Sequence, residues 1–162
     1  MGESDRDDRG RSAPNAEFLR MVDQCVWASR QWVDFVYSRA EPDARPRELL
    51  GHLMTSERIW FDRIAGVPEA ADDFPALDRE DLIRGFEANR ETFRSLIENR
   101  WNDVVDFRRS TGEEYHARVG DIVAHLLTHG YHHRGQLAAH YARKGVAYPN
   151  TDHIHYLIAN RL

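Results

Sequence analysis

Cysteine is nearly absent from the sequence, since the chain of 162 residues contains a single one, Cys25. One cysteine excludes an internal disulfide framework and is typical of proteins in a reducing cytosol. Long hydrophobic runs are lacking too: no apolar stretch reaches the length that spans a membrane, and the first fourteen residues are charged where a signal peptide is apolar. We therefore predict a cytoplasmic protein that does not enter a membrane, with residues 1–14 as a disordered N-terminal tail.

An excess of basic charge is also missing. The net charge is −5 at pH 7 and the sequence pI is about 6.0, so nucleic acid is not an expected partner. Hydrophobic residues make up 41% and charged residues 30% of the chain, which is the balance of a globular domain rather than of a disordered one. The length fits a single domain over residues 15–162.

Four long amphipathic patterns are present, separated by breaks that contain proline or glycine. They predict helices over about 15–40, 46–66, from 78 to before 101, and 120–144, with Asn15 and Asp78 as caps of the first and third. Residues 101–118 predict two short extended pieces around a Thr111-Gly112 turn, and Thr151 is the expected cap of a short final helix. The predicted fold class is all-α: a four-helix bundle with longer, irregular connections and a short C-terminal helix.

Histidines are concentrated in the stretch HLLTHGYHHRGQLAAHY, which holds five of the nine in the chain. With a step of about 100° per residue, His129 and His133 lie within about 40° of each other on the apolar stripe of the fourth helix. His125 lies at one margin of that stripe, and His132 lies farther out. The pattern therefore points two imidazoles toward the interior.

Two histidines at positions i and i+4 on a buried face can chelate one metal ion. The alternative is that both are core histidines hydrogen-bonded to other groups, which is costly for two imidazoles in one stripe. His52, in the middle of the second helix, is predicted to face inward as well. Three inward imidazoles from two helices would leave a metal with open coordination positions, as catalytic sites have.

Other metal chemistries fit the sequence less well. A di-iron bundle needs inward carboxylates on all four helices and two E-x-x-H pairs, and the one such pair here, Glu113 to His116, falls in a turn region. The sequence contains no HExxH, no CxxC and no phosphate-binding glycine loop. The trio of His52, His129 and His133 remains the best candidate.

The HHRGQ segment, preceded by a histidine four residues before its second histidine, resembles the fourth-helix signature of the DinB-like family. GHLMTSERIWFDRIAG is similar to the second helix of that family, and the resemblance extends from about Glu17 to Tyr156. It implies a DinB-like four-helix bundle, often a homodimer, with one divalent metal ion per chain, usually zinc or nickel. By position, the ligands would be His52, His129 and His133.

The wider superfamily includes S-transferases and isomerases that use mycothiol, bacillithiol or glutathione, while many members have no established reaction. The first hypothesis is therefore a metal-dependent transferase that moves a low-molecular-weight thiol onto an electrophilic substrate. Arg63, three turns from His52 on the same face, could hold a carboxylate, and Gln136 could orient a ligand. Both have a plainer interpretation as structural residues.

Two alternatives remain open on the sequence. A metal-activated water would make the protein a hydrolase. A fourth coordination position filled by His125 or a carboxylate would instead make it a non-catalytic metal-binding or oligomeric module.

Overall fold

The computed structural model describes residues 13–40, 42–68, 74–108 and 112–162. In this part of the chain the elements follow in the order α1 (Ala13–Tyr37), α2 (Arg45–Ala65), α3 (Arg79–Asn99), β1 (Val104–Arg108), β2 (Glu114–Arg118), α4 (Val119–Arg143) and α5 (His153–Asn160). The all-α bundle is confirmed. α1 begins at Ala13, two residues before the predicted start of the first helix, and residues 1–12 and the Thr111 turn position lie outside the described residues.

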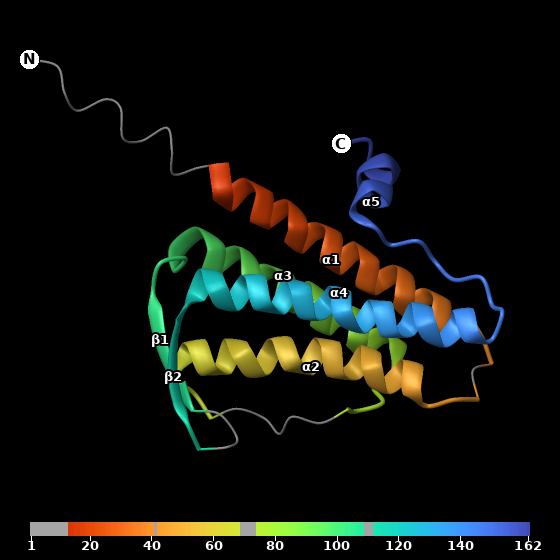
Figure 1. The fold of residues 1–162 in the computed structure, drawn as a ribbon, viewed down its shortest axis with the longest axis horizontal. Coiled ribbons are helices and arrows are strands. Elements are labelled where there is room, and N and C mark those ends of the chain that lie inside the picture. Colours follow the sequence, from red (N-terminus) through yellow and green to blue (C-terminus); the bar gives the residue numbers. More distant parts are fainter. Residues whose placement is uncertain (1–12, 41, 69–73, 109–111) are drawn as a thin grey trace, which may run out of the picture.

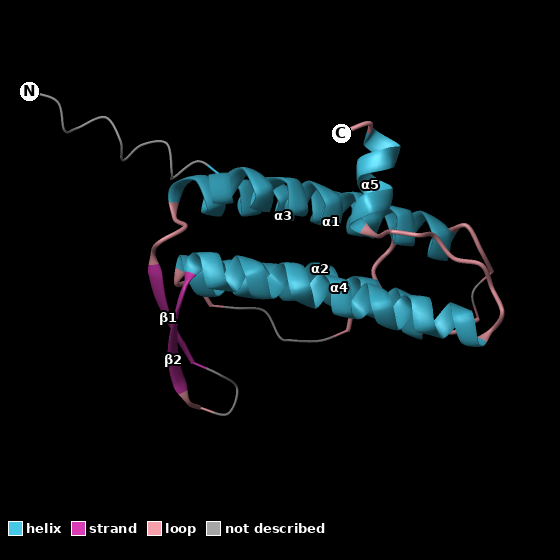
Figure 2. Ribbon diagram, turned by 45° about the horizontal axis from the view of Figure 1, so that its top comes forward, coloured by secondary structure: helices cyan, strands magenta, loops and turns pink. Residues whose placement is uncertain are grey.

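The four long helices form two layers (Figures 1 and 2). α1 and α3 make one layer, α2 and α4 make the other, and the β1–β2 hairpin stands at one end of the α2–α4 layer. α5 packs on the outside of α1 through Tyr156, whose ring lies 5.6 Å from that of Trp27. None of the described helices combines the length and hydropathy of a transmembrane segment.

Local signals account for several helix ends. Asp78 caps α3, its side chain accepting a hydrogen bond from the Asp81 backbone N–H at 2.7 Å. Pro46 lies in the first turn of α2, where it has no hydrogen bond to lose, and Gly66 ends that helix with a φ of 69°.

Two predicted caps were wrong, because tertiary hydrogen bonds use their side chains. Asn15 lies inside α1, and its side-chain amide donates to the Ile97 carbonyl on α3. Asp152, not Thr151, is the N-cap residue of α5. The Thr151 hydroxyl instead accepts from the Trp32 indole N–H, and the Thr151 carbonyl accepts from the side chain of Gln24.

The interior consists of two apolar clusters with polar side chains between them. One cluster lies toward the hairpin and includes Phe93, Ile97, Val123 and Leu127; the other lies toward the opposite end and includes Trp32, Leu50, Phe86 and Leu137. On each of the four long helices a polar residue lies in sequence between the two clusters: Ser29 on α1, Glu57 on α2, Asn89 on α3 and Arg134 on α4. The bundle is therefore apolar at both ends and polar in its middle.

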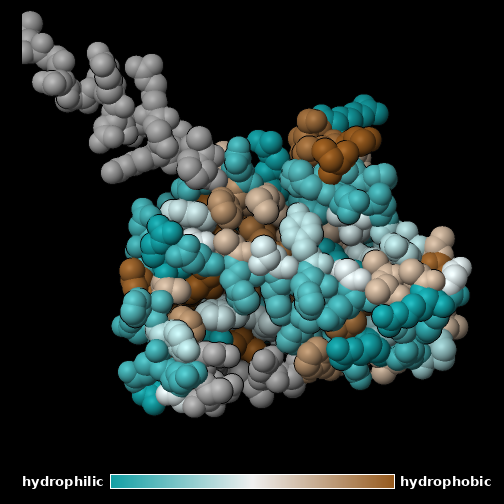
Figure 3. Space-filling model, viewed as in Figure 1, coloured by the Kyte–Doolittle hydropathy of each residue, from teal (hydrophilic) through white to brown (hydrophobic). Residues whose placement is uncertain are grey.

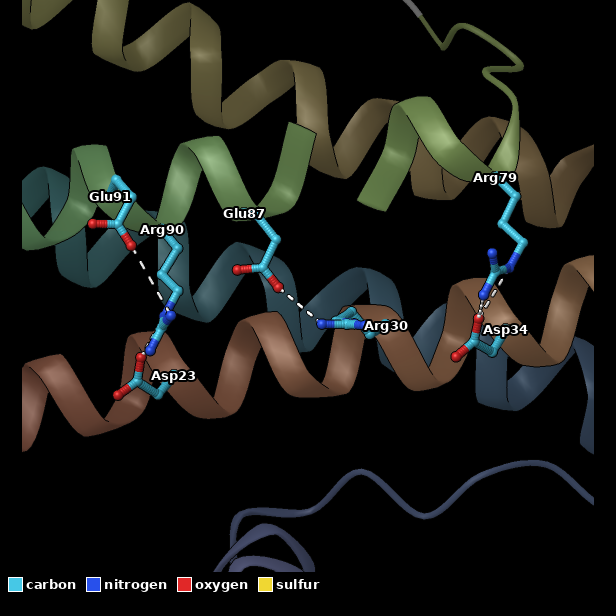
Figure 4. A network of polar contacts seen from close by, with 7 residues as sticks. All are labelled: Asp23, Arg30, Asp34, Arg79, Glu87, Arg90 and Glu91. Carbon is cyan, nitrogen blue, oxygen red and sulfur yellow. Dashed lines mark hydrogen bonds and ion pairs between the residues drawn. The ribbon is translucent and has the colours of Figure 1, made fainter. Parts of the chain in front are cut away.

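Ion pairs join the outer faces of α1 and α3 (Figure 4). Asp34 bonds Arg79 at 2.5 Å, Arg30 bonds Glu87 at 3.1 Å and Asp23 bonds Arg90 at 2.7 Å. Pairs as exposed as the first two contribute about 1 kcal/mol or less each. They favour one register of α1 against α3, and they involve no residue of the α2–α4 layer.

The hairpin carries its apolar side chains on one face. Val105 pairs with Ala117 and Phe107 pairs with Tyr115 in an antiparallel register. Val105 is buried, and Phe107 and Ala117 are partly buried, while their neighbours along each strand are exposed. The two extended pieces predicted for residues 101–118 are thus confirmed, and their apolar face is turned toward the bundle.

Candidate metal centre

Three histidines from two adjacent helices converge in the α2–α4 layer. One ring nitrogen of each of His52, His129 and His133 lies within 4.8 Å of those of the other two. The Nε2 atoms of His129 and His133 are 2.9 Å apart, and the His52 ring centre lies 5.3 Å and 4.8 Å from theirs. The structure therefore brings together the trio that the sequence proposed.

Helix geometry explains the convergence. His129 and His133 are one turn apart on the same face of α4, and His52 faces them from the middle of α2. His52 and His133 are buried, and His129 is partly buried. Three polar rings in such a place need a common partner or a hydrogen-bond network.

The surroundings keep the imidazoles of His129 and His133 neutral. Burial, followed by the charges of the neighbouring histidines, lowers the pKa of His129 to about 4. Burial also lowers the pKa of His133, although its hydrogen bond with Gln136 acts in the opposite direction. Neutral imidazole is the form that coordinates a metal, so the lone pairs required are present near pH 7.

Gln136 sets the orientation of one candidate ligand. Its Oε1 lies 2.9 Å from Nδ1 of His133, and its Nε2 lies 3.0 Å from Nε2 of His132. An amide oxygen can only accept, so Nδ1 of His133 carries the proton and Nε2 presents its lone pair toward His129. Support of this kind is characteristic of metal-binding histidines.

The donor set suits a divalent ion. Around a tetrahedral ion with metal–nitrogen distances of about 2.0–2.1 Å, neighbouring ligand nitrogens would be roughly 3.3 Å apart. The separation of 2.9 Å between two Nε2 atoms is close to that value. In the part of the chain that the structure describes, no carboxylate or thiol joins the three histidines, so the cluster supplies three ligands and leaves coordination positions open.

Phe74 covers the outside of His52. The two rings stack with centres 4.1 Å apart and planes inclined by 13°, and the guanidinium of Arg45 lies 4.9 Å from the centre of the Phe74 ring. Sequence reasoning missed Phe74, because a phenylalanine in a connection carries no local sign of the ring it will contact.

A cavity of about 510 Å³ opens beside the cluster. His52 and His129 belong to its wall, and so do Arg63 and His125. The hairpin closes another side with Phe107, Tyr115 and Ala117. A small organic molecule in this cavity would touch the metal ligands directly, and cavities of such volume hold ligands of that kind.

His125 and Trp60 are part of this wall rather than of the ligand set. The His125 ring lies 5.8 Å from that of His129 and 5.5 Å from that of Trp60. Burial lowers the pKa of His125. Trp60, for which the apolar helix pattern predicted a core position, is partly exposed to the cavity.

A group of polar side chains that we term the polar layer lies in the middle of the bundle: Cys25, Asn89 and Arg134, which are buried, and Glu57, which is partly buried. The Asn89 amide donates to the Glu57 carboxylate at 2.7 Å and to the Met54 carbonyl at 3.0 Å. Arg134 donates to the Cys25 sulfur at 3.3 Å. Burial raises the pKa of Cys25, in agreement with an inert thiol.

Comparison with known proteins gives one match. The model of the DinB family matches residues 15–161 of the chain. No curated protein and no solved structure matches it. The match spans all four long helices and includes the three histidines.

Proposed function

The chain belongs to the DinB family, and on that premise we propose that it is a metal-dependent transferase that joins a low-molecular-weight thiol to an electrophilic substrate. The observation that carries the proposal is the open side of the histidine cluster. Two imidazoles of the cluster, those of His52 and His129, line a cavity of about 510 Å³. A purely structural metal site would instead have a fourth protein ligand that closes it, and no described carboxylate or thiol supplies one.

His52, His129 and His133 would hold one divalent ion, zinc or nickel. Bound there, the ion would supply a Lewis acid that makes a coordinated thiol ionise near neutral pH. Gln136 would keep the His133 ring in its coordinating orientation, and Phe74 would shield His52 from water. The proton of the thiol leaves to solvent, and the cavity holds the second substrate against the sulfur.

The transfer itself needs no other reactant. The sulfur supplies an electron pair to the electrophilic carbon, a C–S bond forms, and the bond from that carbon to the leaving group breaks. The leaving group departs with its electron pair. Arg63, whose guanidinium lies in the cavity wall 4.6 Å from the Trp60 ring centre, would hold a carboxylate of the thiol or of the electrophile.

Metal content is the first test. Elemental analysis after chelation and metal readdition should give about one ion per chain in the wild type, and His52→Ala, His129→Ala and His133→Ala should each lose it. His132→Ala removes a neighbouring histidine outside the cluster and should keep the metal. A folded wild type without metal, or metal retained in all three variants, would sink the proposal.

Turnover is the second test. Zinc- and nickel-loaded protein is supplied with glutathione, bacillithiol or mycothiol and with 1-chloro-2,4-dinitrobenzene, and formation of the thioether is followed by absorbance. We expect a saturable rate with at least one thiol that disappears in His129→Ala. Hydrolysis of an ester substrate without any thiol, and no thioether formation, would point to a hydrolase instead.

A further inference from the structure

Aromatic rings form a continuous series from the hairpin to the metal ligands. Tyr115 lies 6.1 Å from Phe107, and Phe107 lies 5.0 Å from Trp60 in an edge-to-face arrangement. Trp60 then lies 5.5 Å from His125, which lies 5.8 Å from His129. All five residues line the one cavity. One side of the proposed reaction chamber is therefore aromatic along its length, while Ser56, Arg63 and Asp121 contribute polar groups elsewhere in the wall.

The remaining apolar lining comes from Ile59 on α2, Ile122 on α4 and Ala117 on β2. These side chains offer methyl groups beside the ring edges and faces. A surface of this composition favours a flat apolar molecule, because rings gain from offset and edge-to-face contact beyond the burial of their area. A charged or strongly hydrated group placed against these rings would lose its water without an equal return, whereas Arg63 in another part of the wall can receive a carboxylate.

Packing of the hairpin against the bundle does not by itself account for this wall. Well-packed interiors leave few voids larger than a water molecule, whereas here about 510 Å³ stays open between the rings and the histidines. Trp60 and Phe107 are only partly buried, and Tyr115 is 43% exposed. Apolar surface left open beside a candidate catalytic centre is surface for a ligand.

We propose that the electrophilic substrate is an aromatic or conjugated compound, bound in the cavity against Trp60 and Phe107 with its reactive carbon toward His129. The proposal rests on the transferase function above and specifies its substrate class. It also makes the hairpin a specificity element, since Phe107 and Tyr115 belong to no helix of the bundle. The aromatic wall would bind and orient the ring of the substrate, and the histidine cluster would hold the metal ion that binds the thiol.

A comparison of the binding of two matched alcohols tests this proposal independently of catalytic activity. The probes are 2-naphthylmethanol and its saturated analogue, decahydro-2-naphthylmethanol, added to the zinc-loaded full chain with isotope-labelled isoleucine and alanine methyls. The aromatic alcohol should bind about 3- to 10-fold more tightly than the saturated one. Its ring current should shift the methyl signals of Ile59, Ile122 and Ala117, while Ile158 on α5 stays unchanged.

Variants test the wall. Phe107→Leu keeps an apolar side chain but removes the ring, and it should abolish the preference for the aromatic alcohol. Phe107→Tyr restores a ring and should retain the preference. Tyr148→Leu removes an exposed ring outside this cavity and is the matched control. If Phe107→Leu does not fold, the wild-type comparison of the two alcohols still decides the question.

Equal affinity for the two alcohols, or shifts confined to methyls outside the cavity, would overturn the inference. Thioether formation as fast from a saturated alkyl chloride as from 1-chloro-2,4-dinitrobenzene would overturn it while leaving the transferase proposal standing. Selective binding of the aromatic alcohol at Ile59 and Ile122 without any thiol transfer would support the aromatic site and refute the transferase.

Discussion

At the scale of single residues, metal binding at the candidate centre would depend on which nitrogen of His133 bears its proton. The Gln136 amide oxygen accepts from Nδ1, so Nε2 faces the other two imidazoles. Without this acceptor the His133 ring could rotate or adopt the other tautomer. Returning the ring to the coordinating form would cost free energy, and metal binding would be weaker by that amount.

Gln136→Leu should therefore weaken zinc binding about 10- to 100-fold. The residue is exposed, so its loss should change the melting temperature of the metal-free protein little. Competition with a chromogenic chelator measures the affinity. Gln31→Leu, the same substitution at an exposed position of α1, is the control. Equal zinc affinity in Gln136→Leu and wild type would contradict a ligand-orienting role.

Glu57 predicts a pH effect of its own. Burial raises its pKa from 4.5 to about 7, against the hydrogen bond from Asn89 and the charge of Arg134, which both lower it. The folded protein thus holds this proton more tightly than the unfolded chain does. The stability that results is complete below pH 4.5 and is lost as the pH rises through about 7.

Glu57→Gln should remove this dependence, because glutamine resembles the protonated acid. Between pH 5 and pH 8, the free energy of unfolding of the wild type should fall by roughly 3 kcal/mol relative to the variant. Urea denaturation of the metal-free proteins at several pH values measures it. Lowered histidine pKa values act in the opposite direction between about pH 4 and 6.5 but are common to both proteins. Glu98→Gln, the same substitution at an exposed position of α3, is the control. If the difference in free energy of unfolding between the wild type and Glu57→Gln does not change with pH, the prediction of a protonated, neutral Glu57 is contradicted.

At the scale of elements, α2 and the segment 74–78 approach each other at Gly51. A Cβ atom at this position would lie 1.8 Å from the Pro75 carbonyl oxygen. The absence of a side chain lets the segment lie against the helix next to His52, where Phe74 stacks on that ring. A helix-interior glycine costs up to about 1 kcal/mol relative to alanine, and here close packing offsets it.

Gly51→Ala should displace the segment and destabilise the protein by about 1–3 kcal/mol. Zinc affinity should fall as well, because His52 loses the ring that covers it. Gly135→Ala is the matched control, since a Cβ there meets nothing within 4 Å and alanine should favour the helix. Thermal unfolding and chelator competition give the two readouts. If Gly51→Ala and Gly135→Ala have the same thermal stability and the same zinc affinity, close packing at Gly51 does not support the site.

At the scale of the whole molecule, the two faces of α5 differ. Tyr156 is buried toward α1, whereas Ile154, Ile158 and Leu162 are 65%, 69% and 71% exposed. Figure 3 shows hydrophobic surface gathered on this helix, above a largely hydrophilic bundle. Ile154 and Ile158 lie four residues apart and form an exposed stripe on one face of α5, and Leu162 follows just beyond the end of the helix. An exposed stripe of this kind suits a symmetric contact with a second copy.

We therefore propose a homodimer that pairs through α5. Ile158→Lys should convert it to a monomer at micromolar concentration, as measured by light scattering after size-exclusion chromatography. Ala159→Lys adds the same charge beside the stripe and should weaken the dimer less. A wild type that is monomeric at all concentrations, or a dimer unaffected by Ile158→Lys, would exclude this interface.

The sequence by itself determined the elements that depend on nearby residues. The spacing of apolar residues predicted four long helices, and it placed His129 and His133 on one face, because helical periodicity is a local property. The inward direction of His52 followed from the same rule. Where a cap depends on its own turn, as at Asp78, the prediction was confirmed; where distant partners use the side chain, as at Asn15 and Thr151, it was wrong.

The tertiary structure alone decided what surrounds the histidines. Phe74 on His52, the hairpin rings beside Trp60 and the pairing of Glu57 with Asn89 join residues that are far apart in the chain. Their contacts come from the packing of whole elements, and no periodicity within one element encodes which neighbour it will meet. The sequence thus determined the candidate ligands, and the fold decided that they open onto an aromatic cavity.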